Sequence, residues 1–210
     1  MGGKLGTIFA RAGHDVVFSY SRSDKKLERL ARDAGANARA GTPDEASRGA
    51  DALLLAVHWS RVDDVLKKAG DLSGKVIVSC SLPMNADDTD LAVGHTSSGA
   101  EELAKKVRKA RLVQAFNTVP SEVLFSVFEK RRRKNRPSLV YCGDDAKAKQ
   151  VVAELIGDVG FEPIDIGALR MARYSEPFTM IIAQQAYETD RGPALAYRFE
   201  WYEEKRALKD

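Results

Sequence analysis

The sequence holds few of the residues that build metal centres and disulfide frameworks. Its 210 residues include two cysteines and three histidines. Cys80 and Cys142 each lie at the end of an apolar stretch, without the spacing of a zinc site, which favours buried free thiols. We therefore expect no metal site and no disulfide, as suits a reducing cytosol.

Long apolar runs are also lacking. No stretch of the sequence approaches the roughly 20 consecutive apolar residues that a membrane-spanning helix needs. The first residues lack the charged and apolar blocks of a signal peptide. These two absences predict a cytoplasmic protein with no membrane partner.

A large excess of one charge is absent as well. Lysine and arginine number 33 against 30 acidic residues, and the net charge of +3 is too small to imply a polyanionic partner. Cations gather locally in residues 130–136, where six of the seven are lysine or arginine. Such clusters bind phosphates, but this one has no interleaved aromatic residues, so we expect a solvated linker or an anion clamp and no nucleic acid.

Helix-like and strand-like segments alternate along the chain, joined by short turns. This alternation predicts an α/β fold with a Rossmann-like, doubly wound, mostly parallel sheet. The apolar run Ala52–Val57 predicts a strand buried on both faces. The chain from about Ala168 on is expected to be helical. Strands are expected at residues 15–20, 36–40, 52–57, 75–80, 111–116, 138–141 and 161–166.

The basic stretch that ends at Arg136 is the best candidate for a domain boundary. It divides the chain into a larger part, residues 1–136, and a smaller C-terminal α/β and helical part, residues 137–210. We expect the larger part to bind a nucleotide and the smaller part to hold a second pocket or a dimer contact. The apolar face of the last helix, which includes Phe178 and Ile182, needs a partner surface, and a homodimer would supply it.

The chain opens on a helix-like segment with no strand in front of it. In a dinucleotide-binding fold, a first strand runs into Gly-x-Gly-x-x-Gly, and the third glycine lets the first helix pack tightly against the sheet. Gly2 or Gly3 fits that third place. The first strand and the earlier glycines are then missing from this chain, and we expect weak dinucleotide binding and marginal folding.

The turn after the strand at 15–20 indicates which dinucleotide is bound. A carboxylate at this position would accept hydrogen bonds from a ribose 2′-hydroxyl, but the sequence has Ser21, Arg22 and Ser23, followed by Lys25 and Lys26. Hydroxyl donors beside a planar cation suit a 2′-phosphate, so we predict NADP instead of NAD. The alternative is that these charged side chains lie on a solvent-exposed turn and bind no ligand.

Other candidate site residues follow the predicted strands. Ligands of open α/β sheets bind at the carboxyl ends of the strands. The cofactor-binding residues predicted by this rule, in addition to those above, are Val57, His58, Trp59, Ser81, Pro83, Asn117 and Thr118.

The roles of these residues leave alternatives open. His58 could contact the nicotinamide ribose or the pyrophosphate, or relay a proton, or be a strand-end histidine bonded to backbone. Trp59 could wall the cofactor site or pack against the core. Asn117 and Thr118 could fix the nicotinamide carboxamide or the acceptor ring, or stabilise a turn. Pro83 is expected to shape its loop.

Several segments of the chain resemble NADPH-dependent reductases of coenzyme F420, the F420H2:NADP oxidoreductase family. They are Ala12–His14 with the later Ser21–Ser23, Leu55–Trp59, Ala115–Pro120 and Ala172–Pro177. The family shares its fold with the cytosolic domains of transmembrane metalloreductases. The resemblance implies hydride transfer between NADPH and a deazaflavin or a related flavin-like acceptor. Members usually begin with a strand and Gly-x-Gly-x-Met-Gly, from which this chain departs.

Two rival functions remain open. The same fold could reduce another acceptor, such as a flavin, a quinone or a ferric chelate. The cations of residues 130–136 suggest a function of a different class, that of a non-catalytic NADP sensor or a nucleic-acid-binding regulator.

Overall fold

Helices and strands alternate along the chain as its hydrophobic pattern predicts. The computed structural model describes residues 1–21, 23–35 and 37–202. The strands are β1 (Val16–Phe18), β2 (Ala38–Ala40), β3 (Ala52–Leu55), β4 (Val76–Ser79), β5 (Arg111–Gln114), β6 (Ser138–Gly143) and β7 (Glu162–Asp165). The helices are α1 (Gly2–Ala12), α2 (Asp24–Ala34), α3 (Pro43–Gly49), α4 (Val62–Ala69), α5 (Gly99–Lys106), α6 (Leu124–Glu129), α7 (Ala146–Val159) and α8 (Ala172–Tyr187).

The strands form two sheets. In the smaller sheet β1 pairs with β2 in parallel, with Val16 opposite Ala38. The larger sheet has the order β3-β4-β5-β6-β7, and only the β5–β6 pair is antiparallel among its described pairs. The predicted mostly parallel, Rossmann-like architecture is therefore confirmed. Strands on both sides of Arg136 share the larger sheet, and the division into two domains there stays a prediction.

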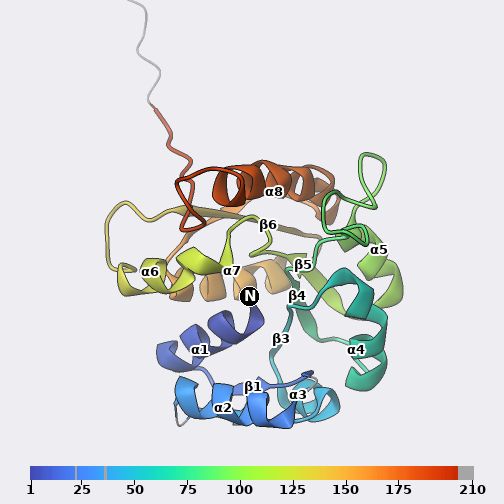
Figure 1. The fold of residues 1–210 in the computed structure, drawn as a ribbon. Coiled ribbons are helices and arrows are strands. Elements are labelled where there is room, and N and C mark those ends of the chain that lie inside the picture. The colour runs from blue at the N-terminus through green and yellow to red at the C-terminus, as the bar shows by residue number, and fades with distance from the viewer. Residues whose placement is uncertain (22, 36, 203–210) are drawn as a thin grey trace, which may run out of the picture.

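Helices cover both faces of the larger sheet, with α4 and α5 on one side and α1, α6 and α7 on the other (Figure 1). The residues of β4 alternate between these faces, as side chains of a strand do. Val76 and Val78 join the core cluster under α1, α6 and α7, and Ile77 joins the cluster under α4 and α5. Burial on both faces stabilises a parallel strand of this kind.

The helix ends follow local sequence signals. Thr42 and Glu45 form a capping box at the start of α3, with Pro43 in the first turn. Gly13 and Gly160, each in the left-handed region with φ near 106–107°, end α1 and α7. Glycine suits both positions because other residues adopt this conformation at a cost.

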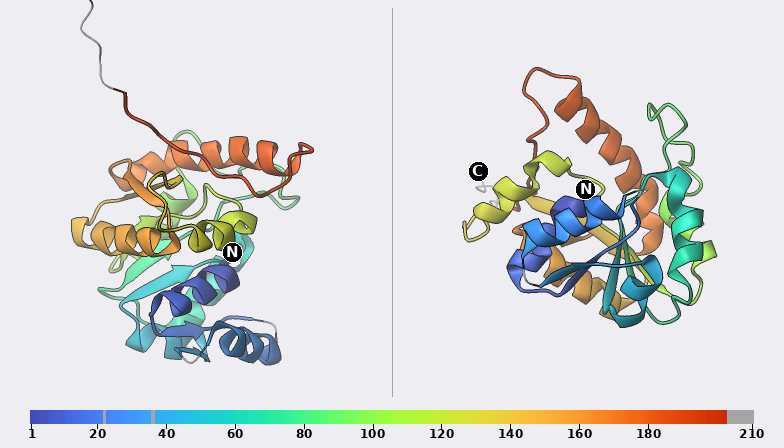
Figure 2. Two further views of the ribbon diagram at one scale, coloured as in Figure 1. Left: turned by 90° about the vertical axis from the view of Figure 1, so that its left-hand side faces the viewer. Right: turned by 60° about the horizontal axis from the view of Figure 1, so that its bottom comes forward.

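Two expectations about burial and helix content are wrong. Of the strand β3, only Leu55 is buried, and Ala52–Leu54 are half-buried, because one edge of β3 has no neighbouring strand among the described residues. Beyond α8, residues 188–202 contain no regular helix. They return across the fold, where the Tyr197 carbonyl accepts the Ser138 N–H at 2.8 Å (Figure 2).

The two cysteines are free. Burial raises the pKa of each thiol to about 12, so roughly one thiol in 10⁴ is ionised at pH 8. We expect almost no reaction of the native chain with Ellman's reagent, and reaction of both thiols in guanidinium, measured by thionitrobenzoate absorbance. Rapid labelling of the native chain would contradict this prediction.

Candidate functional site

A cavity of about 1490 Å³ lies between the two sheets. Its walls come from α1, β1, β3 and the turns that follow these strands. The predicted cofactor-binding residues that line it are Gly2, Gly3, Ser21, Lys26 and Val57. The carboxyl ends of β1 and β3 therefore meet the start of α1 at one cavity, as the strand-end rule predicts.

The amino end of α1 faces this cavity. The first intrahelical bond runs from the Leu5 N–H to the Met1 carbonyl, at 3.1 Å. The N–H groups of Gly2, Gly3 and Lys4 precede that bond and have no intrahelical acceptor. Because the positive end of the helix dipole lies here as well, this wall can accept an anionic group.

Gly2 also lies close to the end of β3. A Cβ atom at Gly2 would sit 3.1 Å from the Ala56 Cβ, tighter than an ordinary van der Waals contact. Gly6, one helical turn further on, lies closer still to Phe18 of β1. Sequence reasoning identified the glycine at position 2 but missed Gly6, which lies in an otherwise ordinary helical pattern.

The turn after β1 presents hydroxyl groups and a lysine. Ser21 Oγ accepts the Ser23 N–H at 3.2 Å, and Ser23 Oγ accepts the Lys26 N–H at 3.4 Å at the start of α2. In both bonds the hydroxyl oxygen accepts, so the hydroxyl hydrogens are left for a ligand. Lys26 has no ion pair within the described residues, and Arg22 lies outside them.

Tyr20 fixes this turn against α4. Its φ of 60° bends the chain sharply, and its hydroxyl donates to Asp64 Oδ2 at 2.7 Å. Lys68 donates to the same carboxylate and lies 5.4 Å from the centre of the Tyr20 ring. Hydrogen bonds from Lys68 and Tyr20 lower the pKa of Asp64. No sequence signal linked Tyr20 to a carboxylate 44 residues away.

His58 has partners for both ring nitrogens. Nδ1 lies 2.8 Å from Ser60 Oγ, and Nε2 lies 2.7 Å from Asp88 Oδ1. Nδ1 also accepts the Ser60 N–H at 3.3 Å, as in the alternative of a strand-end histidine bonded to backbone, and Asp88 belongs to the loop after β4, so His58 links the two loops. Trp59 packs against the core cluster under α4 and α5. Contact of either residue with a ligand stays a prediction.

Ser81 and Pro83 shape the loop after β4. The Ser81 hydroxyl lies 2.7 Å from the Val57 carbonyl, to which it donates, and this bond ties the ends of β3 and β4 together. Pro83 packs against Gly99, where an added Cβ would come within 2.7 Å of the ring. Ser81 therefore fixes the strand ends and Pro83 fixes the start of α5, and neither of them is among the described residues that line the cavity.

Asn117 and Thr118 are buried and bonded inside the protein. Asn117 Nδ2 donates to Thr179 Oγ1 at 3.2 Å, and Thr118 Oγ1 lies 2.8 Å from the Tyr197 hydroxyl. These contacts favour the turn-stabilising alternative over direct ligand contact. Phe116, just before them, is fully buried with a φ of 65° and lines the cavity. Its unusual backbone had no signal in the sequence.

Sequence reasoning also missed the bonding of Glu176. This carboxylate is 1% exposed and accepts hydrogen bonds from the N–H groups of Gly99 and Ala100, at 2.8 and 3.0 Å, and from Gln114 Nε2 at 2.6 Å. Burial raises the pKa of Glu176 above its ordinary value, although the three hydrogen bonds oppose this shift. Glu176 thereby joins α8 to α5 and to the end of β5.

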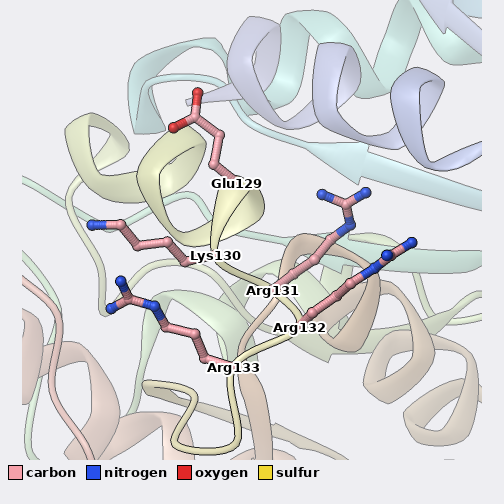
Figure 3. Close-up of a pocket in the computed structure, with 5 residues that line it drawn as sticks. All are labelled: Glu129, Lys130, Arg131, Arg132 and Arg133. Carbon is pink, nitrogen blue, oxygen red and sulfur yellow. The ribbon is translucent and has the colours of Figure 1, made fainter.

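A second hollow, of about 630 Å³, lies at the basic stretch after α6. Its side chains diverge: Lys130 and Arg133 point to one side, and Arg131 and Arg132 to the other (Figure 3). Arg131 is held by the Phe128 carbonyl and stacks 4.1 Å from the Phe128 ring. A divergent set of cations does not converge on one phosphate group.

The described residues offer neither a metal cluster nor a membrane span. No group of three or more histidine, cysteine, aspartate or glutamate side chains among them could hold a metal ion. None of the described helices has both the length and the apolar character needed to cross a bilayer.

Comparison with known proteins finds similarity to one family of reductases. Residues 1–83, which contain every element from α1 to β4, match the family described as NADP oxidoreductase, coenzyme F420-dependent. The F420-dependent NADP reductase of Methanocaldococcus jannaschii is 26% identical over 144 residues. The first 83 residues are thus similar to this family. The Methanocaldococcus match covers 66% of the chain and 63% of the archaeal protein.

A metalloreductase is also similar to this chain. Metalloreductase STEAP3 of Rattus norvegicus is 28% identical over 172 residues, which cover 82% of the chain and 33% of the rat protein. The chain thus spans less than two thirds of the length of either of these relatives. A crystal structure described as an F420-dependent NADP reductase from Arthrobacter sp. FB24 has a TM-score of 0.82 at 20% identity and covers 95% of both chains, which shows the shared fold.

Proposed function

We propose that this chain binds NADP(H) in the cavity between the sheets and transfers a hydride between NADPH and a deazaflavin such as coenzyme F420, or a related flavin-like acceptor. One observation carries the proposal: the free amides of α1, the hydroxyl of Ser21 and the ammonium of Lys26 line the same cavity. The family and the archaeal reductase named for F420 and NADP support it.

The cavity walls suit the parts of a dinucleotide phosphate. The N–H groups at the start of α1 would hold the pyrophosphate, and the close approach of Gly2 to Ala56 leaves backbone there instead of a side chain. Ser21 and Lys26 would hold the 2′-phosphate through hydroxyl and charged donors. NADPH, when bound, supplies the hydride. Phe116 would exclude water from that part of the cavity.

Lys26 gives the first test of the proposal. Replacing Lys26 by alanine should weaken NADPH binding by about 10- to 100-fold, since a hydrogen bond to a charged group contributes about 1.5–3 kcal/mol. NADH binding, which involves no 2′-phosphate, should change little. The two affinities can be measured by isothermal titration calorimetry.

Lys25 provides the matched control. It is exposed on the same turn of α2 but does not line the cavity among the described residues. Lys25→Ala should leave the NADPH affinity within about twofold, because surface charges outside the site interact weakly. Equal losses in the two variants, or equal losses for NADPH and NADH, would contradict the assignment of the 2′-phosphate site.

The acceptor is a separate question. Because one relative is named a metalloreductase, a ferric chelate is the second candidate. Anaerobic oxidation of NADPH, followed by the loss of its absorbance at the nicotinamide band, should be fastest with coenzyme F420 among F420, FMN and ferric citrate. Faster turnover with ferric citrate would favour the second candidate, and no turnover with any of the three would refute the reductase proposal.

We also propose that the chain forms a homodimer through α8 and acts in the cytoplasm. Three large side chains of α8 are more than half exposed: Tyr174, Ile181 and Tyr187. Tyr174 and Ile181, seven residues apart, lie on the same side of the helix, and this exposed side fits a second copy of the chain. Light scattering coupled to size-exclusion chromatography should give twice the mass of the chain, and a monomer would contradict this part of the proposal.

A further inference from the structure

A sharply bent turn joins β1 to α2 at the candidate cofactor cavity. Tyr20 lies in this turn, lines the cavity and has a φ of 60°, in the left-handed region of the backbone. Bulky residues rarely adopt this region, because the Cβ atom then crowds the backbone. Residues in such conformations persist only where their surroundings hold them, and they are concentrated at ligand-binding sites. The contacts of Tyr20 therefore bear on the function of the turn.

Helix α4 supplies contacts that hold the Tyr20 side chain. The Tyr20 hydroxyl donates to Asp64 Oδ2 at 2.7 Å, and the Lys68 ammonium donates to the same oxygen at 2.9 Å. The ammonium also lies 5.4 Å from the centre of the Tyr20 ring, within the range of a cation–π interaction. Because Lys68 and Tyr20 lower the pKa of Asp64, this carboxylate is ionised at neutral pH and the Tyr20 bond is charge-assisted.

The bond between Tyr20 and Asp64 joins two turns of the cavity wall. Tyr20 belongs to the turn after β1, and Asp64 lies in the first turn of α4, shortly after the end of β3. Ser21 of the first turn and Val57 of the second line the same cavity. The bond thus fixes the turn after β1 against the turn and helix that follow β3.

The predicted phosphate-binding residues depend on the conformation of this turn. Ser21 follows Tyr20 directly, and its Oγ accepts the Ser23 N–H at 3.2 Å. Ser23 Oγ in turn accepts the Lys26 N–H at 3.4 Å and caps the start of α2. If Tyr20 returned to a negative φ, the chain would leave β1 in another direction. The Ser21 hydroxyl and the first turn of α2 would then shift relative to the cavity.

We propose that Tyr20 and Asp64 are positioning residues for the 2′-phosphate of NADP(H). Their bond holds the turn in the conformation in which Ser21 and Lys26 line the cavity. This inference rests on the proposed function and adds to it the residues that set the preference for NADPH. NADH has a 2′-hydroxyl in place of the phosphate and gains little from the turn, so loss of the bond should lower the NADPH affinity selectively.

Isothermal titration calorimetry with NADPH and NADH tests the proposal. Tyr20→Phe keeps the ring and removes only the hydroxyl that donates to Asp64. We expect this variant to bind NADPH about tenfold more weakly than the native chain and NADH within about twofold. A general structural role of the hydroxyl would weaken the binding of both dinucleotides by similar factors, so the ratio of the two affinities distinguishes the roles.

A double-mutant cycle assigns the effect to the bond. Asp64→Ala removes a negative charge, which by itself would tighten NADPH binding, so weaker binding identifies the lost bond. Adding Asp64→Ala to Tyr20→Phe should change the NADPH affinity by less than about twofold. Asp64 is exposed on α4, so Asp64→Ala provides the test even if Tyr20→Phe does not fold, which circular dichroism checks.

Tyr187 offers the matched control. Its hydroxyl donates to Glu122 Oε2 at 2.9 Å, a bond of the same kind, and neither residue is among the described residues that line the cavity. Tyr187→Phe should leave the ratio of the NADPH and NADH affinities within about twofold of the native value.

Amide hydrogen exchange without ligand gives a readout that does not depend on binding. The N–H groups of Ser23 and Lys26 are bonded within the turn. Both should exchange faster in Tyr20→Phe than in the native chain, by about threefold or more, because the turn opens more often. The amides of β4, which lies in the larger sheet, should not respond.

Three results would overturn this inference. The first is an unchanged affinity ratio in Tyr20→Phe, and the second is an equal change of the ratio in Tyr187→Phe. The third is a changed ratio with unchanged exchange of Ser23 and Lys26, which would indicate direct contact of Tyr20 with the ligand. If the ratio falls in Lys26→Ala but not in Tyr20→Phe, the proposed function stands and only the inference fails. A native chain that does not bind NADPH would refute both.

Discussion

Replacing Glu176 by alanine is expected to lower the free energy of unfolding by about 3 kcal/mol. The substitution removes the acceptor of two backbone N–H groups, at Gly99 and Ala100, and of the Gln114 amide. All three donors are buried, and each unsatisfied donor costs about 1–3 kcal/mol, which the relief of burying a carboxylate offsets in part. Urea denaturation followed by circular dichroism measures the change.

Glu176→Gln separates the hydrogen bonds from the charge. The glutamine amide keeps one acceptor oxygen, so Glu176→Gln should lower the free energy of unfolding less than Glu176→Ala does. Burial raises the pKa of Glu176 above 4.5 in the folded protein. The stability that this titration contributes is therefore complete below about pH 4.5 and is lost as the pH rises through the folded-state pKa.

The stability advantage of the native chain over Glu176→Gln should accordingly fall as the pH rises from about 4.5 toward neutrality. Taking the difference between the two proteins cancels the titration of the other carboxylates. A stability advantage that stays constant or grows with pH would contradict a buried carboxyl group whose pKa is raised by burial. If Glu176→Ala lowers the free energy of unfolding by less than about 1 kcal/mol, the result would contradict the hydrogen bonding of this carboxylate to three buried donors.

Gly6→Ala is expected to destabilise the fold by about 2 kcal/mol. An added Cβ would lie 2.4 Å from Cε1 and 2.9 Å from Cζ of Phe18, whose ring is 7% exposed. The ring is packed against α2 and has little room to move, so the clash outweighs the gain of about 1 kcal/mol that alanine brings to a helix.

Gly157 supplies the matched control for this prediction. It lies in α7, and an added Cβ there would meet nothing within 4 Å. Gly157→Ala should stabilise the protein by about 0.5–1 kcal/mol. Thermal melts of the two variants should therefore shift in opposite directions, and a shift in the same direction would refute the packing argument.

Much of the fold could be predicted because its signals are local. The apolar run at β4 and the capping residue Thr42 act through neighbours within a few residues. The close packing expected of Gly2 also followed from its register with the strand after Gly13.

The rest depends on contacts between distant residues. Glu176 bonds with partners 62 to 77 positions away, which periodicity cannot indicate. The antiparallel pairing of β6 with β5 has no signal in the sequence of an apolar strand, because either strand direction buries the same side chains. Asn117 and Thr118 were predicted at a strand end, but their bonds to Thr179 and Tyr197 depend on how α8 and the segment after it pack.

The break between the sheets also divides the molecule into parts of unequal strength. Phe18, Leu27 and Ala31 belong to a small core of their own under α2, whereas the five-stranded sheet rests on two larger clusters. Among the described residues, no strand pairing joins this part to the larger sheet. A part with few buried contacts and no such pairing opens at a lower free energy than the whole. Limited proteolysis should therefore cut first within α2, while the larger sheet stays folded.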